Sequence, residues 1–126
     1  IFAGYVDDKA ILDYYNLCDI FVMPNRGTIE HKQLRGDIEG FGIVFMEASA
    51  CAKPVIAGKS GGVEEAVEEG VTGLFVDPNS IEEIADTIIR LFDDKELSER
   101  LANNGHRRAK LHYDWRLLSK ALLRIL

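Results

Sequence analysis

The sequence has 126 residues, a length typical of one domain, and it is 47% hydrophobic and 29% charged. This balance supplies enough apolar side chains for a buried core and excludes a disordered tail. The formal net charge is −6. Because a general nucleic-acid-binding surface needs a basic face, we expect no nucleic acid among the partners.

The two cysteines, Cys18 and Cys51, lie in apolar stretches. We expect two buried free thiols in a reducing compartment, with a disulfide as the alternative. No CxxC pair and no Cys/His cluster is present, so no metal site is predicted. There is no signal-peptide pattern, and no apolar run approaches the roughly 18–20 residues of a transmembrane helix. The predicted location is the cytoplasm.

The first part of the chain predicts short strands that alternate with helices. The expected elements are the end of a strand at residues 1–4, a helix capped by Asp7 or Asp8 that runs to about Leu17, a buried strand at 19–23 ended by Pro24, a long loop at 25–39, and a helix at 43–52.

The second part continues the alternation. The expected elements are a strand at 54–57, a glycine turn at 58–62, a short helix at 63–67, a strand at 74–76, a helix capped by Ser80 with an apolar stripe (Ile81, Ile84, Ala85, Ile88, Phe92), a helix from Lys95 that residues 103–105 interrupt or bend, and a last amphipathic helix that Asp114 caps. This pattern predicts an α/β fold, a Rossmann-like parallel sheet with helices on both faces. Ligands of such sheets bind outside the carboxyl ends of the strands.

Residues 39–42, Glu-Gly-Phe-Gly, open the helix at 43–52. Glycines let the backbone approach a ligand closely, and the N–H groups of a first helical turn point at whatever lies there. The loop is therefore suited to an anion such as a diphosphate.

Glu47 stands in a helix that carries apolar residues on every side, which predicts a buried helix. A buried carboxylate has to be paired or used. It could accept two hydroxyls, such as the 2′ and 3′ hydroxyls of a ribose, or it could pair structurally with a buried Arg, Lys or backbone N–H.

Residues 39–47, EGFGIVFME, resemble the E-x7-E motif of the retaining GT-B glycosyltransferases of family 4, the glycosyl transferases group 1. The resemblance continues through residues 47–58 (EASACAKPVIAG), 59–67 (KSGGVEEAV) and 70–78 (GVTGLFVDP), and residues 3–6 and 19–24 also match in kind and order. An isolated E-x7-E would be a weak match, but this ordered set covers nearly the whole chain.

The resemblance implies a role for each matching residue. Glu39 would be catalytic and would contact hydroxyls of the transferred sugar, and Glu47 would bind the donor ribose. The remaining donor-binding positions would be the backbone amides of Gly40, Phe41, Gly42, Ile43 and Val44 for the sugar and diphosphate, and Gly4, Tyr5 and Val6 for the base.

The implied activity is transfer of a hexose-type sugar from a nucleoside-diphosphate sugar to an acceptor, with retention of anomeric configuration. Amides and a helix N-terminus would stabilise the negative charge that develops on the leaving diphosphate. The family implies neither a cofactor nor a metal. Carbohydrate, lipid-linked and small-molecule acceptors all stay open. The alternatives are a nucleotide-sugar-binding module without catalysis and another GT-B enzyme, such as a sugar-nucleotide epimerase or a phosphorylase.

The resemblance also implies that residues 1–126 are part of a C-terminal donor-binding domain, and that the first strands and the whole N-terminal acceptor domain are absent. We therefore expect the chain alone to be inactive, with any contact to the cytoplasmic membrane face made by the missing domain.

Outside the motif, the basic residues of the loop at 25–39 could approach an anion or be solvated, and Lys59, His106 and His112 are expected at the surface. An exposed apolar stripe in the last helix would cause self-association. The loop residues are Arg26, His31, Lys32 and Arg35, and the stripe is Leu118, Leu122 and Ile125.

Overall fold

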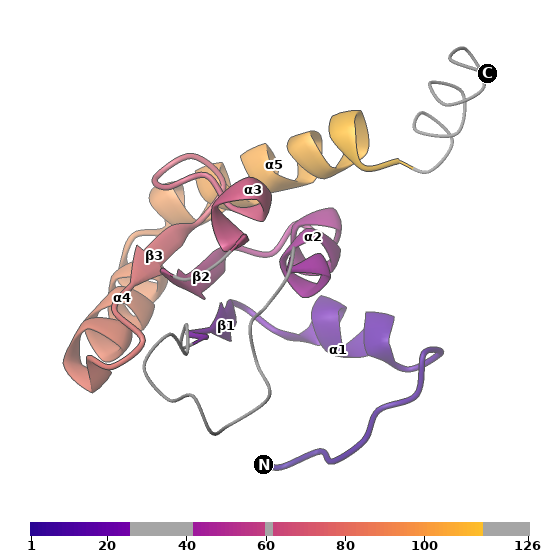
Figure 1. Cartoon of the computed structure of the whole chain (residues 1–126), viewed down its shortest axis with the longest axis horizontal. Helices are drawn as coiled ribbons and strands as arrows, with labels where there is room; N and C mark the ends of the chain where they lie inside the picture. Colours follow the sequence, from indigo (N-terminus) through magenta and orange to yellow (C-terminus); the bar gives the residue numbers. More distant parts are fainter. Residues whose placement is uncertain (26–41, 60–61, 115–126) are drawn as a thin grey trace.

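The structure is a computed structural model that describes residues 1–25, 42–59 and 62–114. Three parallel strands form one sheet in the order β1 (Phe21–Met23), β2 (Val55–Gly58) and β3 (Leu74–Val76). Phe21 pairs with Val55, and Ile56 pairs with Leu74. The helices are α1 (Ile11–Leu17), α2 (Ile43–Ala50), α3 (Val63–Ala66), α4 (Ile81–Asp93) and α5 (Lys95–His112) (Figure 1). The predicted α/β class with a parallel sheet is confirmed.

Helices cover both faces of the sheet, because alternate residues of each strand belong to different apolar clusters. Val55 and Ala57 of β2 pack with side chains of α1, α2 and α3. Ile56, between them, packs with Leu91 of α4 and Leu101 of α5. Every residue of β2 is buried, as expected for a central parallel strand.

The helix α5 is continuous, so the predicted interruption at residues 103–105 is wrong. Gly105 is buried in its middle, and a Cβ there would lie 3.1 Å from Ser49 Oγ of α2. The glycine therefore serves close packing between α2 and α5, which outweighs its low helix propensity.

The helix α4 begins as predicted, because Ser80 Oγ accepts a hydrogen bond from the Glu83 backbone N–H at 3.1 Å. Only part of its predicted apolar stripe faces the core. Ile84 and Ile88 pack against the core together with Leu91, which the prediction did not include. Other stripe members are exposed: Ile81 at 84% and Phe92 at 56%, and Ala85 with them. The helix is thus rotated relative to the predicted stripe, because the core lies on the side of Leu91.

The N-terminal segment differs from the prediction. Residues 1–4 form no strand, since a strand needs a partner and none of β1, β2 and β3 pairs with them. Asp7 Oδ1 accepts hydrogen bonds from the backbone N–H groups of Lys9 and Ala10, but this forms a turn, and α1 begins only at Ile11. The helix ends at Leu17, as predicted.

The strand predicted at 74–76 is confirmed as β3, and the boundaries that differ in β1, α2, β2 and α3 shift by one or two residues. β1 starts at Phe21 and is half-buried rather than buried. α2 ends at Ala50, two residues before Ala52, whose φ of 54° lies in the left-handed region.

Cys18 and Cys51 are free and half-buried, so the disulfide alternative is wrong. Residues 26–39 of the loop predicted at 25–39, and the last predicted helix after Asp114, lie outside the described residues.

Within the described ranges, none of the helices combines the length and the apolar character needed to cross a membrane.

Candidate functional site

The carboxyl ends of β1 and β2 lie against each other. A Cβ on Gly58, the last residue of β2, would lie 2.5 Å from the backbone oxygen of Asn25, which follows β1. Only glycine permits this approach, because the obstacle is backbone rather than a movable side chain. This edge is where ligands of a parallel sheet bind.

The helix α2 starts after Gly42, which is buried and has a φ of 72°. A Cβ at Gly42 would be strained by this conformation and would also lie 2.6 Å from the Phe45 ring. The first N–H groups of a helix have no partner within the helix. Those of Ile43 and Val44 occupy that position, and the Ile43 side chain is 65% exposed.

Glu47 lies one turn further along and is exposed, so the expectation of a helix buried on every side is wrong. The buried residues of α2 are Phe45, Met46, Ala48 and Ser49. Ile43 and Glu47 lie on the opposite side, four residues apart. Apolar residues on the outer side of α2 made the helix resemble a fully buried one.

The Glu47 carboxylate has a partner that the sequence did not reveal. The Tyr15 hydroxyl of α1 donates a hydrogen bond of 2.8 Å to Glu47 Oε2. Tyr15 is 6% exposed, and its ring centroid lies 5.6 Å from that of Phe21, which in turn contacts Phe45 edge to face. The available clue was that a tyrosine on the inner face of a helix needs a partner for its hydroxyl.

The surroundings keep Tyr15 protonated. Burial raises the pKa of Tyr15, and the hydrogen bond to Glu47 and the charge of Glu47 raise it further. A phenol with the ordinary pKa of 10.0 already donates at physiological pH, and the raised pKa extends this donation to more alkaline pH.

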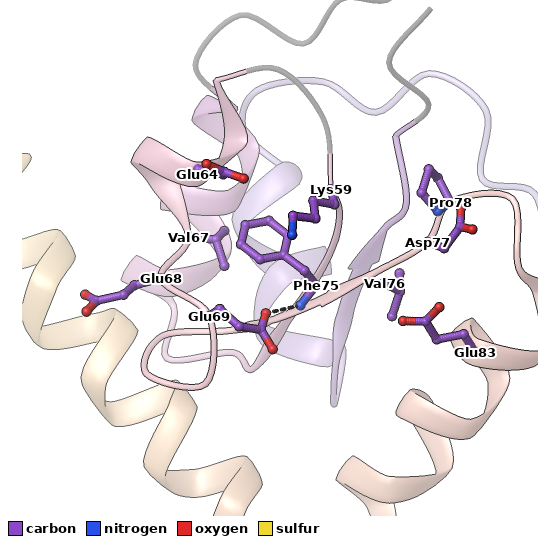
Figure 2. Close-up of a pocket in the computed structure, with 10 residues that line it drawn as sticks. All are labelled: Lys59, Glu64, Val67, Glu68, Glu69, Phe75, Val76, Asp77, Pro78 and Glu83. Atoms are coloured by element: carbon purple, nitrogen blue, oxygen red, sulfur yellow. Dashed lines mark hydrogen bonds between the residues drawn. The ribbon is translucent and has the colours of Figure 1, made fainter.

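A separate hollow of about 760 Å³ lies beside the carboxyl end of β3, between α3 and the start of α4 (Figure 2). Its lining contains five carboxylates and one lysine, together with apolar side chains: Lys59, Glu64, Val67, Glu68, Glu69, Phe75, Val76, Asp77, Pro78 and Glu83. The Glu69 carboxylate accepts a hydrogen bond from the Phe75 backbone N–H of β3. This acidic lining would repel a diphosphate, so the predicted anion site is the start of α2 instead.

The family model described as "Glycosyl transferases group 1" matches residues 1–108. The chain belongs to this family.

Curated relatives of this glycosyltransferase chain include a "GDP-mannose-dependent alpha-(1-6)-phosphatidylinositol monomannoside mannosyltransferase" of Mycobacterium tuberculosis. It is 37% identical over 124 residues, which cover 96% of the chain and 30% of the relative. An "Alpha-D-kanosaminyltransferase" of Streptomyces kanamyceticus is 34% identical over 103 residues, or 82% of the chain and 24% of the relative. The chain thus spans less than a third of the length of these relatives.

Solved glycosyltransferase structures share the fold. Sucrose-phosphate synthase from Thermosynechococcus elongatus matches with a TM-score of 0.82 and 29% identity, over 99% of this chain and 29% of that one. The Anabaena protein Alr3699/HepE in complex with UDP-glucose matches with a TM-score of 0.71 and 28% identity, over 89% and 28% of the two chains. The fold is therefore the Rossmann-like α/β fold of GT-B glycosyltransferases, represented by part of its length.

Several of the positions that the family resemblance selects come together in this glycosyltransferase domain. Gly42, Ile43, Val44 and Glu47 occupy the first turns of α2. Tyr5 is 91% exposed in the irregular segment before α1, where Gly4 and Val6 also lie. Predicted residues outside the described ranges are Arg26, His31, Lys32, Arg35, Glu39, Gly40 and Phe41.

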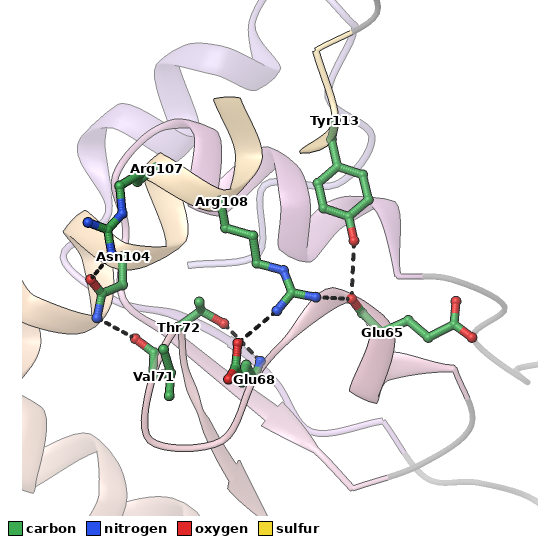
Figure 3. Close-up of polar contacts among 8 residues, drawn as sticks. All are labelled: Glu65, Glu68, Val71, Thr72, Asn104, Arg107, Arg108 and Tyr113. Atoms are coloured by element: carbon green, nitrogen blue, oxygen red, sulfur yellow. Dashed lines mark hydrogen bonds and ion pairs between the residues drawn. The ribbon is translucent and has the colours of Figure 1, made fainter. Parts of the chain in front are cut away.

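The helix α5 holds α3 in place through polar contacts that link residues far apart in the chain (Figure 3). Arg108 forms an ion pair with Glu68 at 3.0 Å and donates to the backbone oxygen of Glu65 at 2.8 Å. The Tyr113 hydroxyl donates to the same oxygen at 3.2 Å. These contacts fix the short helix that follows the glycine turn.

The predicted surface residues differ in their surroundings. Lys59 and His112 are exposed, as predicted. His106, also expected at the surface, is half-buried instead, and its Nδ1 lies 2.7 Å from the backbone oxygen of Ala50. His106 thus links α5 to the C-terminal end of α2.

Proposed function

We propose that this chain is the donor-binding part of a retaining GT-B glycosyltransferase of family 4, which transfers a hexose from a nucleoside-diphosphate sugar to an acceptor. The observation that carries the proposal is the arrangement at the start of α2. An exposed carboxylate, Glu47, lies one turn after the helix-start amides of Ile43 and Val44, which have no partner within α2. Hydroxyls and a diphosphate are the groups that such an arrangement binds.

Each part of the donor has a proposed partner. The amides from Gly40 to Val44 contact the sugar and the diphosphate, Glu47 binds the ribose, and the segment from Gly4 to Val6 lies near the base. Glu39 contacts hydroxyls of the transferred sugar and is the proposed catalytic residue. As the anomeric bond breaks, the α2 N-terminus stabilises the charge that grows on the diphosphate.

The proposed reaction needs no metal ion and no cofactor. Among the described side chains, no group of three or more His, Cys, Asp and Glu residues could hold a metal ion. Whether the reaction proceeds without one is tested by adding a chelator to the transfer assay, and we expect no loss of rate.

The names of the relatives suggest donors to test first. A GDP-mannose-dependent mannosyltransferase is among the relatives, and a structural neighbour is in complex with UDP-glucose. The chain would supply the donor half of a cytoplasmic enzyme. An acceptor domain outside residues 1–126 would select a carbohydrate, lipid-linked or small-molecule acceptor and make any membrane contact, so residues 1–126 alone would be inactive.

The test measures nucleotide binding by the complete polypeptide that carries this chain, with GDP, UDP and ADP and their common sugars, by isothermal titration calorimetry. We expect Glu47→Ala to weaken binding about 10- to 100-fold whichever sugar is attached, as expected for a lost hydrogen bond to a charged group. The control is Glu82→Ala, which removes an exposed glutamate that lies on a different helix, α4. Unchanged affinity in Glu47→Ala would show that the site assignment is wrong.

A second variant separates catalysis from binding. We expect Glu39→Ala to slow transfer much more than it weakens binding of the bare nucleoside diphosphate, because its proposed contacts are with the sugar. Donor binding without any turnover in the unsubstituted protein would favour a binding module instead. Epimerisation or phosphorolysis would favour another GT-B enzyme.

A further inference from the structure

We propose that Tyr15 is a positioning residue for Glu47: its hydroxyl holds one carboxylate oxygen so that the other is presented to the ribose of the donor. This inference rests on the proposed function, because it requires Glu47 to bind that ribose.

The pair joins a buried donor to an exposed acceptor. Tyr15 is the only buried residue of α1. Its ring packs against Phe21 of β1, which packs against Phe45 of α2, so the strand and the helix that form the site also fix the ring. Glu47 is exposed. An exposed glutamate samples several rotamers, and the bond of 2.8 Å to Oε2 selects among them.

The chemistry of the pair leaves room for a ligand. A phenol donates one hydrogen bond, whereas a carboxylate can accept about four. After Tyr15 has used one position on Oε2, Oε1 remains available for the neighbouring 2′ and 3′ hydroxyls of a ribose. Because the carboxylate is held before the ligand arrives, less rotamer freedom is lost on binding.

A structural link between helices and the orientation of Glu47 for a ligand are two roles that predict different effects of losing this hydrogen bond. In the described residues the Tyr15 hydroxyl contacts Glu47 across 32 positions of sequence, from α1 to α2. A purely structural link between the two helices would hold α2 in place but would give no preference between ligands that differ only at the ribose.

The test compares Tyr15→Phe with Tyr14→Phe in the complete polypeptide. Tyr14 is the next residue of α1 and is 49% exposed, so its variant controls for loss of a tyrosine hydroxyl. For each protein, the Kd is measured for the tightest-binding nucleoside diphosphate among GDP, UDP and ADP and for its 2′-deoxy counterpart.

We expect Tyr15→Phe to weaken binding of the ribonucleotide roughly 3- to 10-fold, the effect of one ordinary hydrogen bond. Binding of the 2′-deoxy nucleotide should weaken less. The Kd of the 2′-deoxy nucleotide divided by the Kd of the ribonucleotide should therefore fall. Tyr14→Phe should leave both constants unchanged. A purely structural role of Tyr15 would weaken both ligands equally and leave the ratio unchanged, and that result would overturn the inference.

The outcomes separate this inference from the proposed function. If Glu47→Ala weakens binding but Tyr15→Phe changes neither constant, the inference fails and the proposed function stands. If Glu47→Ala changes nothing, or the unsubstituted protein binds none of the three nucleotides, both fail. Should Tyr15→Phe not fold, 3-fluorotyrosine placed at position 15 provides a stronger donor of nearly the same shape. A ratio that stays unchanged with it would overturn the inference.

Discussion

The Tyr15 phenol makes the stability of the domain depend on pH in the alkaline range. Burial and the neighbouring Glu47 raise the pKa of Tyr15 above its ordinary value of 10.0. Below about pH 10 both the folded and the unfolded chain keep the proton, and the stabilisation is complete. Above that pH the unfolded chain loses the proton first. The stabilisation is therefore lost progressively as the pH rises towards the pKa of the folded state.

This predicts a difference between wild type and Tyr15→Phe in urea unfolding from about pH 8 to pH 11. The free energy of unfolding of wild type should exceed that of Tyr15→Phe by a constant amount up to about pH 10, and the gap should then narrow. Tyr14→Phe, which keeps the buried pair, should follow the wild-type profile. Parallel profiles for wild type and Tyr15→Phe across the whole range would contradict the raised pKa.

Single residues of the candidate site were predictable to different degrees. For Glu47 the sequence left two interpretations open, hydroxyl binding and structural pairing, and their premise of a fully buried helix was wrong because Glu47 is exposed. Composition alone could not show that Ile43 faces outward, because exposure depends on which side of α2 meets the sheet and α5. Tyr15 was not singled out from the sequence, because its partner lies 32 positions away.

At the scale of elements, a single residue, Asp94, connects the helices α4 and α5. It ends α4 and caps α5, where its Oδ1 accepts a hydrogen bond from the Leu97 backbone N–H at 2.9 Å. The Leu97 side chain is buried in the apolar cluster that contains Ile56 of β2 and Leu91 of α4. The cap therefore helps to direct α5 across the sheet.

We expect Asp94→Ala to lower the free energy of unfolding by about 0.5–2 kcal/mol, the usual cost of a lost N-cap. Asp93→Ala is the matched control, since Asp93 is the exposed last residue of α4 and caps no helix. Chemical denaturation of both variants measures the difference. Equal effects of the two substitutions would show that charge rather than capping is responsible.

Local signals predicted the ends of some elements better than their orientation. The cap at Ser80 is a short-range hydrogen bond, so the sequence nearby was enough to predict it. The inward side of α4 and the continuity of α5 depend on packing partners elsewhere. Gly105 illustrates this, because a local propensity cost of about 1 kcal/mol is outweighed by contact with Ser49.

At the scale of the whole molecule, the alternation of short strands and helices was sufficient to predict a parallel sheet covered on both faces. The strands lie side by side in chain order, and each parallel pair is joined by a connection that contains a helix. The acidic hollow was not predictable, because Lys59, Glu64 and Glu83 reach it from separate elements. No pattern along the chain brings these three positions together.

One surface of α4 bears on how the chain behaves in solution. Ile81, Ile89 and Phe92 are 84%, 56% and 56% exposed. At 3.6 residues per turn they fall on one side of the helix, next to the exposed Ala85. An apolar stripe of this kind favours burial against another surface. The self-association expected from the last segment of the chain thus has a second source among the described residues.

We predict that residues 1–126 self-associate as their concentration rises, and that the double substitution Ile89→Ser with Phe92→Ser shifts the chain towards the monomer. The matched control is Leu12→Ser with Leu17→Ser, which removes exposed apolar side chains of α1 instead, at 57% and 81% exposure. Sedimentation velocity over a concentration series distinguishes the three proteins. If the α1 variant dissociates and the α4 variant does not, the contact lies on α1. If neither variant changes, contact through the last segment remains, because Leu118, Leu122 and Ile125 are intact in both.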